Sequence, residues 1–330
     1  MTTTFIGLAL ALAMTAAPAS AQDAKAADVL AKTRKALGDK KLDGLKGLSL
    51  QAATQRNIGS MQMSGTVDIA IELPDKYVRS EVSNGMMTMT LNTGFNADKA
   101  IMPGGGASMA PGGGMVIRMG PGGMMPNDGP KPTPEQLAEM NKAAVRSQRA
   151  EISRLMLGWL GMTHPALPAQ YAYAGEAESP DGKAHVIDVK DADGFSARLF
   201  IDQNNYLPLM VTYQGRQPRI VTQGGPMGAA GGAAQTHVQP QAQQTQTAAL
   251  TEEERKKLAA DAEKQVQQQI AQTPTVEFTL FFDDWREVDG IQFPHVMRRG
   301  TGGEVSEEWT ISKVKVNPKL DAKTFAAETK

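Results

Sequence analysis

The chain has 330 residues, 34 Lys and Arg against 35 Asp and Glu, and no cysteine. The length suits one large domain or two small ones. The net charge of −1 gives no electrostatic reason to expect an acidic surface as partner, and the dispersed basic residues, without stacking aromatics between them, argue against nucleic acid. The lack of cysteine excludes disulfides, thiolate metal ligands, cysteine nucleophiles and a lipid-modified N-terminal cysteine.

An export signal is predicted at the N-terminus. A short apolar run covers residues 5–13, and the small residues Ala19 and Ala21 fit an A-x-A cleavage rule. The run departs from the usual pattern because no Lys or Arg precedes it. It is too short to span a bilayer, and no other segment is apolar enough to do so. We therefore expect a signal peptide over residues 1–21, cleaved after Ala21, and a periplasmic mature protein with no transmembrane segment.

A short amphipathic helix is expected next, over residues 23–37, with Asp23 as its cap and Gly38 at its end. Apolar and polar residues then alternate, which is typical of strands with one dry and one wet face. This pattern predicts strands in the ranges 48–52, 63–73, 77–82 and 87–91.

The composition changes to Gly, Met and Pro between residues 103 and 130, which predicts a mobile loop without helix or sheet ladder. Thioethers are soft ligands for Cu(I), so a copper site is one interpretation. The others are a lid over an apolar opening and plain disorder. The methionines concerned are Met102, Met109, Met115, Met119, Met124 and Met125, with Met86, Met87 and Met89 before them.

Residues 134–160 are predicted to form the longest amphipathic helix. Thr133 can cap it, Pro134 suits the first position, Gln136 completes a capping box, and Gly161 can end it. Its apolar residues recur at helical spacing: Leu137, Met140, Ala144, Ile152, Leu155, Met156 and Trp159.

Three short strands are expected after this helix, near residues 185–189, 197–201 and 207–213. A Gln-rich linker and a polar helix follow over residues 223–274. The chain then alternates again from 276 to 316, with Asp289-Gly290 as a tight reversal and a phase slip that predicts a bulge near Ser312. In the last strand Val305, Glu307, Trp309 and Ile311 share one face.

About nine strands with short turns argue for one antiparallel sheet. One apolar helix cannot cover both faces of such a sheet, so we expect the sheet to wrap around it. The predicted fold is mainly β, a single strongly curved antiparallel sheet (an incomplete β-barrel) around one long and one short helix, with disordered insertions. It forms one domain over residues 22–330, interrupted at 103–130 and 223–274.

Three turn motifs resemble one known family. They are Leu199-Phe200-Ile201-Asp202 with Leu207-Pro208, then Val288 to Pro294, and lastly Val314 to Pro318 with Leu320-Asp321 and Phe325. With an exported N-terminus and a leading helix, the chain resembles the LolA/LolB-like outer-membrane lipoprotein-sorting family over residues 24–100, 133–222 and 275–327. The resemblance implies an incomplete barrel closed by helices around an apolar cavity, which carries acyl chains or binds lipids or lipidated partners across the periplasm. No ligand-binding residue of the family is carried over.

The cavity that the resemblance implies would be lined by apolar residues of the strands and of the long helix. Their alternative role is that of an ordinary closed core. Each acyl methylene removed from water would contribute about 0.8 kcal/mol. The candidates are Met63, Val67, Ile69, Ile71, Met87, Met89, Leu91, Leu155, Met156, Trp159, Leu199, Ile201, Phe278, Leu280 and Trp309.

No pattern in the sequence indicates catalysis or a cofactor. His164, His185, His237 and His295 lack zinc-ligand spacing, and neighbouring carboxylates such as Asp283-Asp284 point to opposite faces of a strand. We expect no enzyme activity, no cofactor and no metal. The predicted function is that of a periplasmic carrier for a lipid or acylated protein. The alternative is an envelope protein-interaction or stress-sensing module on the same scaffold.

Overall fold

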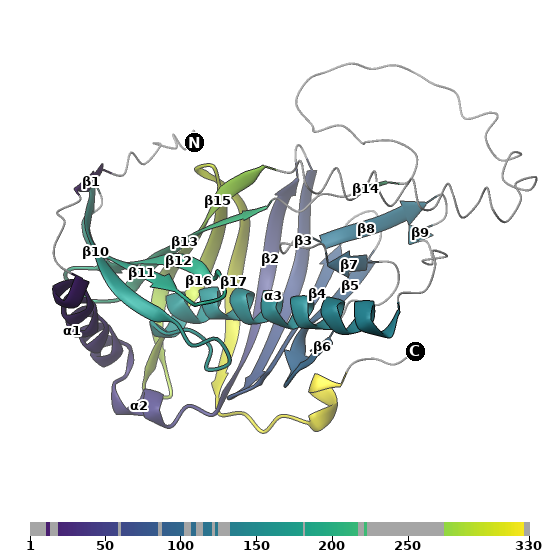
Figure 1. Ribbon diagram of the computed structural model, residues 1–330, viewed down its shortest axis with the longest axis horizontal. Coiled ribbons are helices and arrows are strands. Elements are labelled where there is room, and N and C mark those ends of the chain that lie inside the picture. Colours follow the sequence, from purple (N-terminus) through teal and green to yellow (C-terminus); the bar gives the residue numbers. More distant parts are fainter. Residues whose placement is uncertain are drawn as a thin grey trace, which may run out of the picture. The chain divides into compact units, whose positions relative to one another are not determined.

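The computed structural model describes residues 11–13, 19–58, 61–84, 88–101, 107–109, 115–120, 123–124, 133–180, 182–216, 221–222 and 274–326 (Figure 1). The chain divides into two compact units. Unit 1 comprises Met1–Met102, Asn141–Gly215 and Val276–Lys330, and unit 2 comprises Pro103–Met140 and Arg216–Thr275. The predicted linker and polar helix at 223–274 lie, except for residue 274, outside the described residues.

Unit 1 contains one large antiparallel sheet of 13 strands, more than the nine or so that the sequence predicts. In spatial order the strands are β1 (Ala11–Ala13), β10 (Gln170–Ser179), β11 (Gly182–Lys190), β12 (Ser196–Asp202), β13 (Pro208–Arg216), β15 (Thr275–Val288), β16 (Ile291–Thr301), β17 (Glu304–Val316), β2 (Gly47–Ile58), β3 (Met61–Glu72), β4 (Lys76–Asn84), β5 (Thr88–Asn96) and β6 (Lys99–Ile101).

The turn chemistry of the last three strands is as predicted. Asp289 and Gly290 both have positive φ, 52° and 81°, and join β15 to β16 in a tight reversal. The register between β17 and β2 shifts between Ile311 and Lys313, so the predicted bulge at Ser312 is confirmed.

Four helical segments are described: α1 (Ala19–Leu37), α2 (Lys40–Asp43), α3 (Pro134–Leu160) and the 3-10 helix η2 (Ala322–Phe325). The predicted capping box of α3 is confirmed, because the Thr133 N–H donates to Gln136 Oε1 at 2.8 Å and the Gln136 N–H to Thr133 Oγ1 at 3.2 Å. The cap predicted for α1 is wrong, since α1 begins at Ala19 and Asp23 lies inside it.

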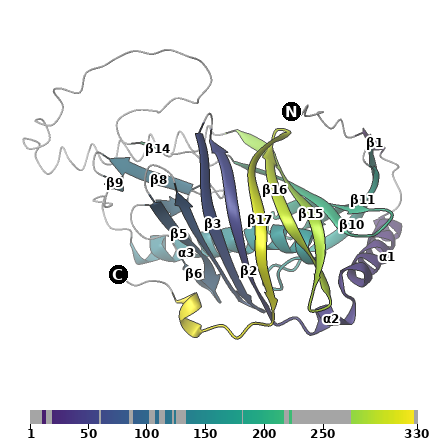
Figure 2. The same ribbon diagram turned by 180° about the vertical axis from the view of Figure 1, so that it is seen from behind.

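The sheet of unit 1 curves strongly around α3. In the strand order β13 and β4 are six positions apart, which is about 29 Å in a flat sheet. Glu151 of α3 nevertheless accepts a hydrogen bond from Arg79 of β4. Arg154 lies about one helical turn, 5.4 Å, further along α3 and stacks on Tyr213 of β13. Figures 1 and 2 show α3 on one face of the sheet when seen from either side.

The residues just after α3 extend this argument to the ends of the sheet. The Thr163 N–H donates to the Tyr171 hydroxyl of β10 at 2.9 Å, and the His164 ring meets the edge of Phe95 of β5 at 5.4 Å between centroids. Adjacent residues therefore contact strands near opposite ends of the sheet. Among the described strands, β1 and β6 each pair with one neighbour, so the sheet stays open. This confirms the predicted curved, incomplete barrel.

Unit 2 corrects one expectation. Within residues 103–130 the sequence predicts no sheet ladder, yet β7 (Ala107–Met109), β8 (Met115–Gly120) and β9 (Gly123–Met124) are strands. β8 pairs with β7 and β9 antiparallel and with β14 (Val221–Thr222) parallel. The run Met115-Val116-Ile117 is apolar and partly β-branched, and pairing across sequence-distant segments overrides the flanking glycines. The remaining residues of 103–130 lie outside the described ranges.

In the part of the chain that the structure covers, no helix combines the length and the apolar character that crossing a membrane requires.

Candidate functional site

The inner face of the sheet, meaning the face that contacts α3, is largely apolar and closely packed. Most of the predicted cavity residues lie here with between 0% and 8% of their surface exposed: Val67, Ile69, Ile71, Leu155, Met156, Trp159, Leu199, Ile201, Phe278, Leu280 and Trp309. Met63 and Leu91 are only partly buried. Met87 and the side chain of Met89 lie outside the described residues.

Side chains with almost no accessible surface face neither bulk water nor a void that holds a water molecule. The buried residues of the inner face and of α3 are therefore covered by their neighbours in this state. The eleven residues named above, except Phe278, belong to one cluster of buried residues, to which both the sheet and α3 contribute. Any guest on this face would have to take the place of the helix side chains.

Gly158 sets how closely α3 approaches the sheet. A Cβ atom at this position would lie 1.9 Å from Cζ of Phe282, which projects from β15. The absence of a side chain therefore lets the phenyl ring pack directly against the helix backbone. Beside it, Trp159 packs on Phe293 of β16 with 5.4 Å between ring centroids.

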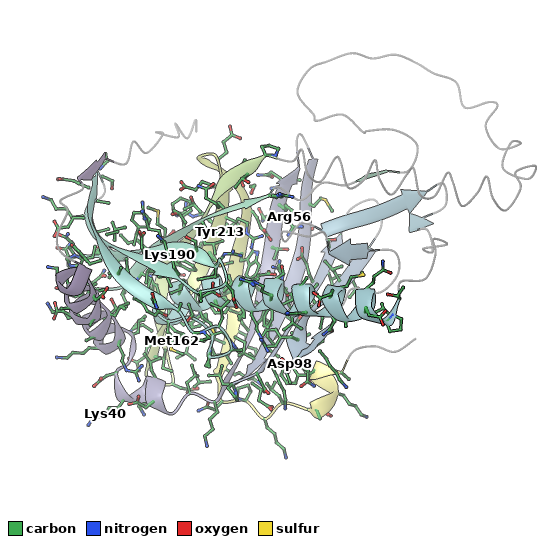
Figure 3. The ribbon with its side chains drawn as sticks, in the orientation of Figure 1. Lys40, Arg56, Asp98, Met162, Lys190 and Tyr213 are labelled. Carbon is green, nitrogen blue, oxygen red and sulfur yellow. The ribbon has the colours of Figure 1, made fainter. Side chains whose placement is uncertain are left out.

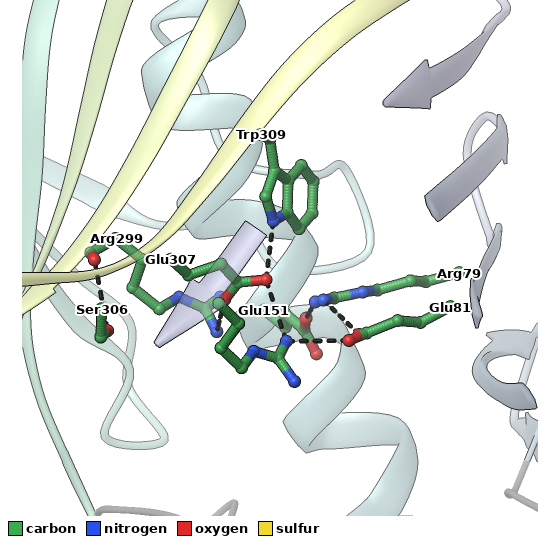
Figure 4. Close-up of polar contacts among 8 residues, drawn as sticks. Arg79, Glu81, Glu151, Arg299, Ser306, Glu307 and Trp309 are labelled. Atoms are coloured by element: carbon green, nitrogen blue, oxygen red, sulfur yellow. Dashed lines mark hydrogen bonds and ion pairs between the residues drawn. The ribbon is translucent and has the colours of Figure 1, made fainter. Parts of the chain in front are cut away.

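A charged cluster interrupts the apolar inner face (Figure 4). We define it as Arg56, Arg79, Glu81, Glu151, Arg299 and Glu307. Arg79 is at its centre: Nη2 donates to Glu81 Oε2 at 2.7 Å and Nη1 donates to Glu151 Oε1 at 2.6 Å. The Arg79 guanidinium also lies over the Trp309 ring, 4.9 Å from its centroid. All members except Glu151 are on strands; Glu151 comes from α3.

Glu307 is the most deeply buried carboxylate of the charged cluster, with 3% of its side chain exposed. It accepts from the Trp309 indole N–H at 2.7 Å and from Arg56 Nη2 at 2.9 Å, and it faces Arg299 at 3.6 Å. Burial alone would raise its pKa, but Arg299, Arg56 and Arg79 together lower that pKa to about 2.

Burial and neighbouring charge also shift the pKa of Arg79 in opposite directions. Burial lowers the pKa of its guanidinium, whereas Glu81 and Glu151 raise it by a larger amount, so that Arg79 stays charged. Its Nε–H is buried without a hydrogen-bond partner. The sheet alone contributes three arginines and two glutamates to the charged cluster, and Glu151 of α3 balances the remaining positive charge.

A second arginine on α3 lies nearby and contacts aromatic rings instead of carboxylates. The Arg154 guanidinium lies 4.2 Å from the centroid of Tyr213, and Tyr213 stacks on Phe278 at 5.3 Å. Among the described residues Arg154 has no ion pair, and burial lowers its pKa. In Figure 3, Arg56 and Tyr213 both lie on the upper side of α3.

The sequence contained a signal for this cluster that the site prediction did not use. The alternation of the last strand puts Glu307 on the same face as Trp309 and Ile311, which is the buried face in the structure. The alternation of β4 likewise puts Arg79 in phase with buried Tyr77. Charged residues in phase with buried apolar residues indicate an internal polar network. The partners could not be predicted, because Arg56 and Glu307 are 251 residues apart.

The histidines form no metal centre in the described ranges, where no group of three or more His, Asp or Glu side chains could hold an ion. His164 is fully buried, its Nδ1 accepts from the Ala166 N–H at 3.1 Å, and burial together with Arg149 lowers its pKa to about 4. Ser153 accepts from the backbone N–H of His164, which is a structural role. His237 lies outside the described residues, as do the side chains of the methionines proposed to bind copper.

The acidic turn residues have structural partners as well. Asp191 Oδ1 accepts from the backbone N–H groups of Asp193 and Phe195, which closes the turn between β11 and β12. Asp283 pairs with Arg298, and Asp284 pairs with Arg286. These contacts give each of the carboxylates a partner within the local fold.

No protein-family model matches the chain, and no curated protein does. Solved structures do. A LolA superfamily protein from Nitrosomonas europaea aligns with a TM-score of 0.43 and 8% identity, over 91% of this chain and 97% of its own. A DUF1329 family protein from Desulfovibrio piger aligns with a TM-score of 0.41 and 10% identity, over 92% of this chain and 97% of its own. A structure described as a putative outer membrane lipoprotein-sorting protein domain from Vibrio parahaemolyticus aligns with a TM-score of 0.39 and 10% identity, over 92% of this chain and 97% of its own. The proteins from Nitrosomonas europaea and Vibrio parahaemolyticus carry the name of the family that the turn motifs resemble.

Proposed function

We propose that this chain is an exported carrier that holds the acyl part of a lipid, or of an acylated protein, against the inner face of its sheet. One observation carries the proposal. In the described part of the chain, α3 packs on the inner face of a strongly curved, open sheet, and Ala26, Val29 and Leu37 of α1 belong to the same buried cluster. The apolar surface that a guest would need is therefore present, and α3 covers a large part of it.

The energies of helix and guest are comparable. The apolar side chains that α3 buries in this layer include Val145, Ile152, Leu155, Met156, Leu157, Trp159 and Leu160. At about 2 kcal/mol for each fully buried side chain, these seven contribute about 14 kcal/mol. An acyl chain with about 14 methylenes gains about 11 kcal/mol when it is buried. A chain of this length therefore recovers most of the free energy that α3 contributes, as a carrier that must both load and release requires.

The test is to identify what the protein holds after purification. Protein isolated from the cell envelope under detergent-free conditions is extracted with organic solvent, and the extract is analysed by mass spectrometry. The proposal expects lipid in near-stoichiometric amount, and it expects the delipidated protein to bind a fluorescent fatty-acid probe with saturation. Absence of both signals would remove the carrier function.

A second function is favoured by the packing itself. Because the described side chains of the inner face are almost fully buried, the scaffold can serve instead as a protein-interaction or stress-sensing module whose outer surfaces contact an envelope partner. Affinity capture from an envelope extract separates the two functions. A stable protein partner together with lipid-free purified protein favours the module; lipid without such a partner favours the carrier.

Export is part of the same proposal. If the first 21 residues are a signal peptide, the mature protein begins at Gln22. Mass spectrometry of the intact protein after expression with its own N-terminus, combined with fractionation of the cell, tests this directly. A periplasmic protein lacking residues 1–21 is expected. A protein that retains these residues in the cytoplasm would contradict export.

A further inference from the structure

We infer that Arg79 is the binding residue for an anionic headgroup, and that Glu151 of α3 occupies this position when no ligand is bound. The ligand class is a single-chain amphiphile with a carboxylate or phosphate group. The inference rests on the proposed carrier function and deepens it, because it names the charge of the ligand and the residue that recognises it.

The first argument is the composition of the contact surface of α3. Glu151 places a carboxylate 2.6 Å from the Arg79 guanidinium, and the next residues along the buried stripe, Ile152, Leu155 and Met156, pack into the apolar layer. An acidic group followed by an apolar stem is also the chemistry of an anionic amphiphile. The helix therefore offers the sheet the same two types of contact that such a ligand would offer.

The second argument is charge balance. Without α3, the strand residues of the charged cluster are Arg56, Arg79 and Arg299 against Glu81 and Glu307, an excess of one positive charge. Glu81 and Glu307 are held by two arginines each. With α3 in place, 7% of the Arg79 side chain is exposed. A guest that takes the place of α3 would keep the guanidinium covered but would remove the Glu151 acceptor. A buried guanidinium that loses one carboxylate is strongly destabilised, so a guest that displaces α3 is favoured if it brings an anion.

The geometry around Arg79 supports recognition of a planar or tetrahedral anion. One nitrogen, Nη2, is fixed by Glu81, and the guanidinium lies over the Trp309 ring, so its orientation is set by the sheet and not by α3. Nη1, which Glu151 now holds, is the donor that a ligand would take over, and the unpartnered Nε–H lies on a different edge of the guanidinium. A guanidinium held in this way offers directional donors that match carboxylate or phosphate oxygens.

The experiment compares three ligands of equal chain length: dodecanoate, dodecyl phosphate and dodecanol. Each is titrated below its micelle concentration into the delipidated full chain, and binding is followed by tryptophan fluorescence. For the wild-type protein, we expect at least one of the two anions to bind about tenfold or more tightly than dodecanol, in line with the strength of charge-assisted hydrogen bonds. Which anion binds better distinguishes a carboxylate from a phosphate headgroup.

Two variants assign the roles. Glu151→Gln removes the internal competitor and should tighten the binding of all three ligands by a similar factor. Glu139→Gln, the same change at an exposed position of α3, should leave the affinities unchanged. Adding Arg79→Gln to Glu151→Gln, so that no unpartnered charge is created between the two, should abolish the preference for anions. If the double variant does not fold by circular dichroism, Arg79→Lys serves instead and should reduce the preference.

The outcomes separate the two proposals. If dodecanol binds as tightly as both anions, or if the preference survives replacement of Arg79, the headgroup inference is wrong while the carrier function stands. If none of the three ligands binds, both are wrong.

Discussion

Glu307 is a carboxylate on which burial and neighbouring charge act in opposite directions, and charge prevails. Its pKa falls from an ordinary 4.5 to about 2. A lowered carboxyl pKa contributes stability that is present above the ordinary pKa and is lost as the pH falls toward the folded-state value. We predict that Glu307→Gln lowers the free energy of unfolding at pH 7 by about 3 kcal/mol, because it leaves three arginines short of a buried partner.

Urea unfolding followed by fluorescence measures this change. The matched control is Glu308→Gln, since Glu308 is the next residue of the same strand and is exposed. This control should change the unfolding free energy by less than about 0.5 kcal/mol. Equal effects of the two variants would show that the charged cluster has no special energetic role.

His164 provides a pH dependence in a different window. Its pKa is lowered from 6.5 to about 4, so the folded protein holds the neutral ring while the unfolded chain binds a proton. Stability from this residue is therefore complete above about pH 6.5 and decreases as the pH falls toward 4, by about 3 kcal/mol in all. His164→Asn keeps an acceptor for the Ala166 N–H but cannot titrate. The variant should show a flatter curve of unfolding free energy between pH 6.5 and 4; a curve parallel to the wild type would contradict the assignment.

For single residues, the sequence indicated which face of a strand a side chain occupies, but not which residues it contacts. Alternation put Glu307 in phase with Trp309, and it put Asp289-Gly290 at a reversal, because both properties depend on neighbouring residues only. The three arginines around Glu307 come from β2, β4 and β16, and nothing local to any of these strands specifies their meeting. The surroundings of His164 could not be predicted for the same reason, because its burial depends on Phe95, which lies 69 positions earlier in the sequence.

Helix α3 shows how one small residue determines the packing of an element. Replacing Gly158 by alanine gains about 1 kcal/mol of helix propensity. It also places a methyl group inside the Phe282 ring, at 1.9 Å from Cζ, where the packing has no room. The clash should dominate, and we predict a net loss of about 2 kcal/mol in unfolding free energy. Phe282→Leu should restore part of the loss in the double variant. Full additivity of the two single changes would show that the contact is not the cause.

Two ends of elements were predictable from local chemistry, whereas the start of α1 was not. The capping box at Thr133 and Gln136 is local chemistry and was predicted correctly. The turn motif at Val316-Asn317 has a specific basis too: the Asn317 side chain accepts from the Lys46 N–H at 2.6 Å and donates to the Gly44 carbonyl at 2.8 Å. It thereby joins the end of β17 to the start of β2. The short strands in the Met-rich segment were missed because glycines interrupt the alternation there, although β7 and β9 pair with the neighbouring β8 and only β14 is remote in sequence.

At the scale of the whole of unit 1, curvature was predictable and closure was not. The shortage of apolar helices relative to strands implied that the sheet bends around α3, and contacts of Thr163 and His164 with β10 and β5 bear this out. How tightly the inner face packs depends on the fit of Phe282 against Gly158 and of the charged cluster against Glu151. Such fits are set by three-dimensional complementarity, which alternation does not encode.

The central claim is that α3 can leave the inner face when an acyl chain takes its place. The chain lacks cysteine, so Met156→Cys introduces a single thiol at a fully buried position of α3. The rate of its modification by a thiol reagent is measured with and without dodecanoate at saturating concentration, with Val186→Cys, buried on β11, as the control. The account predicts an increase of about tenfold or more for position 156 and no change at position 186. An unchanged or slower rate at position 156, at saturation, would contradict it.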